Sequence, residues 1–208
     1  KGLSARVLAV GFPDRVHLAF DADHVRLGLL WQGDFMNAKG TWEGRAGQLE
    51  SPMGLSSQLL PAGAAFAVLD HANDPWPDEM GKPADWRMKG HRRSPEGEPT
   101  FIYQNGSLRI EEHLAPQVGP GEAGFVRSFR VESKHAVPNL YLRIAQASTI
   151  DIGDDPPSAV RTAKTSDGLR LSIPAPGALL RTFEKGQELL IPAVFQDENR
   201  HFQAQASV

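Results

Sequence analysis

The stretch TFIYQNGSLRIEEHL, residues 100–114, carries the clearest fold signal in the sequence. In it, two segments that alternate apolar and polar residues flank Asn105 and Gly106. An Asn-Gly pair between such segments is the strongest short-range signal for a β-hairpin, because a type I′ turn needs a positive φ at both of its central residues. After the turn the apolar residues recur with period 2, which is typical of a strand with one buried face. The stretch therefore predicts an antiparallel hairpin.

Short extended segments separated by turn residues continue in both directions from this hairpin. No window longer than about 12 residues keeps the 3.6-residue period and the capping residues of a helix, although residues 34–39 fit a single helical turn. We therefore predict an all-β protein, an antiparallel β-sandwich or twisted sheet pair with about ten to twelve strands and few or no helices. The other strand candidates are residues 6–10, 16–21, 25–31, 34–37, 64–69, 125–133, 140–147, 169–173, 179–183 and 188–195.

Length and turn content predict one β-sandwich domain spanning residues 1–208. A chain of 208 residues buries about 70% of the surface that it exposes when unfolded, so it needs no covalent staples. With 40% hydrophobic residues, the 20 Gly and 16 Pro indicate many turns and not disorder. Residues 70–99 are predicted to form one long loop, a feature that is uncommon and often functional. Because the chain starts at Lys1, we expect an excised domain or a processed protein.

Composition excludes several classes of function. The formal net charge is −3, which argues against nucleic acid as the main partner, because neutralising phosphates needs a clustered basic surface. The chain has no Cys, so disulfides, thiolate zinc sites, Cys nucleophiles and covalently attached haem are excluded within it. No apolar run approaches the ~18 residues of a membrane span. We therefore expect no contact with nucleic acid and no membrane insertion.

Catalytic motifs are sparse. The segment GPGEAG, residues 119–124, matches the dinucleotide fingerprint in form, but a strand and not a helix is expected after it, so we interpret it as a turn and expect no cofactor. Neither H-E-x-x-H nor G-x-S-x-G occurs. Glu111, Glu112 and His113 are candidates for general acid–base catalysis. The alternative is that strand alternation places them on a solvated face.

Acidic residues also cluster before two prolines. Asp151, Asp154 and Asp155 form an oxygen-rich segment of the kind that can hold Ca²⁺. Their spacing is not that of an EF-hand, which needs a glycine at the sharp turn and a distal glutamate. An ordinary polar turn explains the same residues, and we expect no metal site.

Aromatic residues give the strongest hint of ligand binding. Sugar sites place flat aromatic rings against C–H faces and fix hydroxyls with a few polar groups. Trp76 and Trp86 lie in the predicted loop, with Arg87 and His91 close in sequence, and Asp34 follows another tryptophan. These five residues are our candidates for ligand contact. The alternative is that the tryptophans bury large areas and anchor the core.

Several spaced Gly, Trp and Phe positions resemble a known kind of module. The segments VGFP (10–13), AFDA (19–22), LWQGDF (30–35), WEGRAG (42–47) and FVRSF (125–129) resemble a β-sandwich module of large bacterial extracytoplasmic proteins that also carry c-type cytochrome and sugar-dehydrogenase-like domains. The likeness spans about residues 5–145. It implies an extracytoplasmic location and redox chemistry in neighbouring domains. The general shape also resembles the galactose-mutarotase-like supersandwich, which is a likeness of fold and not of function.

Two hypotheses follow from the sequence. The first is a non-catalytic module that binds carbohydrate or docks against neighbouring domains of the same polypeptide. The second is a sugar-acting enzyme, mutarotase-like or glycoside hydrolase-like, with a Glu/His acid–base pair. The second requires these groups to converge in a concave site with a raised carboxylate pKa. A purely structural spacer, with both loop tryptophans buried and no cleft, is a third possibility.

Overall fold

The all-β prediction is confirmed. The computed structural model describes residues 2–42, 50–77, 85–120, 122–153, 160–174, 177–193 and 205–207. In these residues the only helical element is a short 3-10 turn, η1 (Lys39–Trp42). The other regular elements in these residues are β-strands, and every strand pairing in these ranges is antiparallel. No helix in this part of the chain is long and apolar enough to span a membrane.

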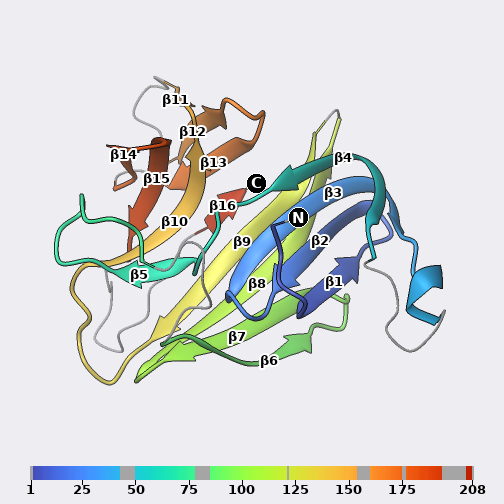
Figure 1. Ribbon diagram of the computed structural model, residues 1–208, viewed down its shortest axis with the longest axis horizontal. Helices are drawn as coiled ribbons and strands as arrows, with labels where there is room; N and C mark the ends of the chain where they lie inside the picture. Colours follow the sequence, from blue (N-terminus) through green and yellow to red (C-terminus); the bar gives the residue numbers. More distant parts are fainter. Residues whose placement is uncertain are drawn as a thin grey trace.

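The described strands form three sheets (Figure 1). The first sheet has the order β1 (Val7–Gly11), β2 (Val16–Asp21), β3 (Arg26–Met36), β4 (Pro52–Leu59). The second has the order β14 (Leu179–Phe183), β15 (Gly186–Pro192), β10 (Leu140–Ala147), β5 (Phe66–Val68). The third has the order β11 (Ile150–Ile152), β12 (Val160–Thr165), β13 (Arg170–Pro174), β16 (Gln205–Ser207), β9 (Glu122–Glu132), β8 (Leu108–Gly119), β7 (Pro99–Asn105), β6 (Arg87–Arg93).

The predicted hairpin forms, but its turn is shifted by one residue. Asn105 is the last residue of β7, and it pairs with Leu108, the first residue of β8. The two-residue loop is Gly106-Ser107, and of these only Gly106 has a positive φ, +55°. A positive φ at the first central position alone is the type II′ pattern, which also matches the right-handed twist of the strands. The expected type I′ turn centred on Asn105 and Gly106 is therefore wrong in register.

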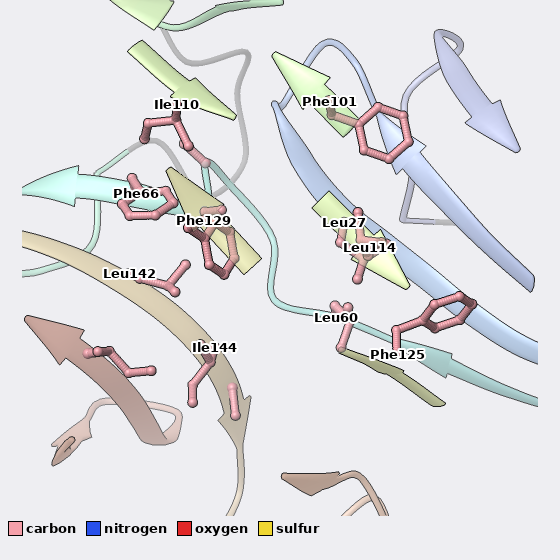
Figure 2. Close-up of a cluster of buried hydrophobic side chains, with 14 of the residues drawn as sticks. Leu27, Leu60, Phe66, Phe101, Ile110, Leu114, Phe125, Phe129, Leu142 and Ile144 are labelled. Carbon is pink, nitrogen blue, oxygen red and sulfur yellow. The ribbon is translucent and has the colours of Figure 1, made fainter. Parts of the chain in front are cut away.

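Aromatic contacts connect the three sheets within the larger cluster of buried hydrophobic side chains, part of which Figure 2 shows. Phe20 of β2 stacks on Phe101 of β7, with ring centroids 4.0 Å apart. Phe66 of β5 meets Phe129 of β9 edge to face, with centroids 5.4 Å apart. A single cluster of buried side chains therefore includes residues of all three sheets. The single domain spanning residues 1–208 stays a prediction.

The segment expected to be one long loop at 70–99 is interrupted by β6, so the predicted loop is too long. β6 pairs along its length with β7, with a bulge between Met88 and Gly90. The sequence hides this strand because it lies at a sheet edge and is largely exposed. An edge strand buries little on either face, so the apolar alternation that marks a strand is missing.

A buried carboxylate fixes the start of the first sheet. Asp21 is fully buried, and it accepts hydrogen bonds from the Ser4 hydroxyl at 2.6 Å and the Ser4 amide at 2.9 Å. The His24 imidazole lies 2.9 Å away. Burial alone would raise the pKa of Asp21, but the hydrogen bonds from Ser4 and His24 outweigh it and lower the pKa below its ordinary 3.8. The carboxylate therefore stabilises the fold in its ionised form.

Asp21→Asn should lower the free energy of unfolding by about 1.5–3 kcal/mol at pH 7, the range for hydrogen bonds to a charged group. Because the folded pKa is lowered, the stabilisation is present above 3.8 and is lost as pH falls through the folded pKa. Urea titrations from pH 7 to pH 2.5 should show the gap between the two proteins closing in acid. Asp14→Asn, at an exposed turn, is the control. A gap that stays constant with pH contradicts this assignment.

Candidate functional site

The triplet 111–113 does not act as one group, because adjacent strand residues point to opposite faces of a sheet. Glu112 faces the core and has no exposed surface. It accepts hydrogen bonds from Arg127 Nε at 2.9 Å and from the Tyr103 hydroxyl at 3.1 Å. Burial raises the pKa of Tyr103 well above its usual value, so the hydroxyl stays protonated and donates to the carboxylate. Glu112 is thus part of a core ion pair, and it does not share a face with Glu111 or His113.

Glu111 and His113 lie on the other face of the third sheet, among polar residues of β6–β9. Register aligns Arg92, Thr100, His113 and Ser128 in one row across the four strands, and Glu111 beside Arg130 in the next. On β7, β8 and β9 the intervening residues are core residues such as Phe101 and Ile110. On β6 the intervening positions are the exposed His91 and Arg93. We call this surface the outer polar face, and its members are Arg92, Thr100, Arg109, Glu111, His113, Ser128, Arg130 and Glu132.

Two arginines hold the Glu111 carboxylate. Arg92 Nη2 lies 2.7 Å from Glu111 Oε2, and Arg109 Nη2 lies 3.0 Å from Oε1. The hydrogen bond from Arg92, followed by that from Arg109, lowers the pKa of Glu111. Both carboxylate oxygens are therefore engaged and the group is anionic at neutral pH. A general acid needs the opposite, a carboxyl with a raised pKa.

His113 bridges a carboxylate and a hydroxyl. Its Nε2 lies 3.0 Å from Glu98 Oε2, and its Nδ1 lies 3.2 Å from Thr100 Oγ1. These groups follow the order of a nucleophilic triad, in which an imidazole lies between a carboxylate and a hydroxyl. Such a triad also needs a substrate pocket. One depression of the described residues lies elsewhere, beside the β8–β9 hairpin. The three residues cross-link β7 and β8 on the outer polar face.

The depression, of about 380 Å³, lies where the β1–β2 turn and β3 meet the β8–β9 hairpin. Arg15, Gln32 and Val118 are among its lining residues. Asp34, a predicted ligand contact, lies beside it, with Oδ1 2.9 Å from Arg15 Nη2. This places Asp34 on the first sheet, away from the other four predicted contacts.

Both tryptophans of the predicted ligand site are buried. Trp76 donates its indole N–H to the Ala64 carbonyl at 2.9 Å, and the Arg143 guanidinium lies 4.6 Å from its ring centroid. Trp86 meets Tyr103 edge to face, with centroids 5.7 Å apart. Neither ring offers a flat face to a sugar, so the packing alternative from the sequence accounts for both.

Arg87 and His91 lie on β6, in a concentration of cations that sequence reasoning missed. Four of the seven β6 residues are Arg or Lys, and none is acidic. The concentration of cations is visible in the sequence RMKGHRR, residues 87–93. Because this segment was predicted to be a loop, the sequence did not indicate that its cations share a sheet edge. Placed on a strand, they line one edge of the third sheet.

The acidic cluster gains no support as a metal site. Asp151 lies on β11, is exposed and is paired in register with Lys164. Asp154 and Asp155 lie outside the described residues. Among the residues that the structure describes, no group of three or more His, Cys, Asp or Glu side chains could hold a metal ion.

Comparisons with protein-family models, curated proteins and solved structures found no match. We therefore infer the function of this protein from the residues of the outer polar face and of the adjoining strand β6.

Proposed function

We propose that this chain is a non-catalytic docking module that binds another protein segment or domain through the outer polar face. The observation that carries the proposal is the Arg92–Glu111–Arg109 cluster. Its charged groups come from two adjacent hairpins, and each is held within 3.0 Å of its neighbour. Charges that are already ordered before binding lose less entropy when a partner arrives. They also favour partners of complementary charge and suppress others.

The enzyme hypothesis has less support. Its two carboxylates face opposite sides of the sheet, and the pKa of Glu111 is lowered by Arg92 and Arg109. A bound carboxylate with a lowered pKa neither donates a proton at neutral pH nor has a free oxygen for attack. These features fit a recognition surface better than an acid–base site.

Carbohydrate binding is the second form of the proposal. Burial of Trp76 and Trp86 removes the aromatic platform, while a flat row of guanidinium, hydroxyl and imidazole groups on β6–β8 remains. Such groups can hydrogen-bond sugar hydroxyls or acidic sugars. The extracytoplasmic location and neighbouring redox domains implied by the sequence resemblance would suit either form.

The test is a titration followed by amide NMR shifts of the labelled chain. The ligands are neutral oligosaccharides, oligogalacturonate, an acidic peptide and a basic peptide, with p-nitrophenyl glycosides included to detect turnover. We expect at least one ligand to cause saturable shifts confined to β6–β9, without turnover. Arg109→Ala should weaken that binding about tenfold, since it removes a charged contact.

Arg161→Ala, at an exposed position of β12, is the matched control and should bind as the wild type does. No saturable shift on β6–β9 with any ligand would overturn the proposal. Turnover that is lost in His113→Gln would instead support the enzyme hypothesis.

A further inference from the structure

β6 ends the third sheet and leaves one backbone edge open. In the order of that sheet β6 is terminal, and in the described part of the chain it pairs only with β7. A terminal strand presents a row of N–H and C=O groups that another strand can pair with. Figure 1 shows β6 at the margin of the molecule, beyond β7.

The charge on this edge is concentrated and of one sign. Arg87, Lys89, Arg92 and Arg93 are all exposed, as is His91, and β6 holds no carboxylate. The whole chain has 22 Lys and Arg and a net charge of −3, so this density is far above its average. Arg92 is paired with Glu111 of the same sheet. Lys89 and Arg93 add to the positive potential of this edge, which attracts anionic segments.

This charge also determines which strands the edge can accept. Two β6 edges from separate copies would bring like charges opposite each other, which disfavours pairing. Charges and the bulge at Met88–Gly90 are devices that protect an edge against indiscriminate association. An extended segment with carboxylates at alternate positions would instead be attracted by the cations of β6.

We propose that β6 accepts an acidic, extended peptide segment as an additional strand of the third sheet. Backbone hydrogen bonds supply affinity in this mode of recognition, and side chains supply specificity. The inference rests on the proposed docking function and names the chemistry of its partner.

The test uses the full chain and a fluorescein-labelled peptide of eight alternating Glu and Thr residues, followed by anisotropy. A second peptide carries N-methyl groups on every internal amide, which keeps the charges and removes the N–H donors. Polygalacturonate serves as a polyanion without a peptide backbone. We expect saturable binding of the first peptide that weakens with salt, and at least about tenfold weaker binding of the methylated peptide.

Charge reversal on the strand supplies the matching variant. Lys89→Glu with Arg93→Glu should weaken peptide binding at least about tenfold, because attraction becomes repulsion. Lys185→Glu with Arg161→Glu makes the same change in charge at exposed positions outside β6 and should leave affinity within about twofold. Circular dichroism confirms that all variants keep the fold.

The outcomes separate the two proposals. Equal binding of the methylated peptide, or of polygalacturonate, would overturn strand addition. An acidic peptide that fails to bind, while another ligand shifts the outer polar face, would overturn this inference and leave the docking function standing. If no ligand binds at all, both proposals fail.

Discussion

Replacing Glu188 by alanine should lower the free energy of unfolding by about 3–5 kcal/mol, the usual loss when one partner of a buried ion pair is removed. Glu188 accepts hydrogen bonds from Arg143 Nη1 at 2.6 Å and from Arg181 Nε at 2.7 Å, and it is almost wholly buried. Without it, two buried guanidinium groups face each other with no counter-charge.

The loss should extend to the segment before β6. Arg143 also donates to the Ala62 carbonyl, and Arg181 donates to the carbonyls of Ala72 and Asp74. These bonds hold the chain on either side of β5, including the turn that carries Trp76. The Trp76 environment should therefore become more exposed to solvent in the Glu188→Ala protein, and a red shift of its fluorescence should show this.

Urea unfolding followed by circular dichroism measures the change in stability. Glu184→Ala, in the exposed turn between β14 and β15, is the control and should change stability by less than about 0.5 kcal/mol. A loss below about 1 kcal/mol for Glu188→Ala would mean that water reaches the two arginines, and would contradict the burial described above.

Phe20→Ala should have an effect of similar size, about 3–5 kcal/mol, because it removes a buried aromatic ring and leaves a cavity. The ring stacks on Phe101 across the gap between the first and third sheets, at an interplanar angle of 13°. It also lies 6.0 Å from the ring of Tyr103. Val118→Ala, at an exposed position of β8, should be close to neutral.

The same experiment tests the single domain. Tryptophan fluorescence and circular dichroism report on different parts of the fold. Their unfolding transitions should coincide if one core joins the three sheets. Separate transitions in the wild type, with only one of them moved by Phe20→Ala, would show that the first sheet unfolds independently.

Period-2 alternation predicted the strands that bury one face. β2, β8 and β10 carry apolar residues at alternate positions, and these positions are buried. β4, β6, β11, β12 and β16 were missed, and the separate strand predicted at 34–37 is wrong because residues 34–36 belong to β3. β4, β6 and β11 are edge strands, and β4 contains Gly and Ser whereas β6 is rich in cations. The signal of a strand in sequence comes from burial, and edge strands supply little of it.

The candidate site was predictable only in part. Period 2 alone implies that Glu111 and Glu112 face opposite sides of a strand. Their partners, Arg92 and Arg127, come from other strands and depend on register, which a single sequence does not determine across long connections. The burial of Trp76 and Trp86 depends likewise on contacts with Ala64, Arg143 and Tyr103.

The order of the second sheet has a consequence for synthesis on the ribosome. β1–β4 and β6–β9 are meanders in which each strand pairs with the next along the chain, so every pairing closes over a connection of at most fifteen residues. β10 instead pairs with β5, about seventy residues earlier, and with β15, about forty residues later. Pairing between strands far apart in sequence is slow, because the chain loses the entropy of loop closure before any stabilising contact forms. Nascent chains stalled before β15 should therefore hold two finished meanders and a β10 that lacks one neighbour, the state most in need of a chaperone.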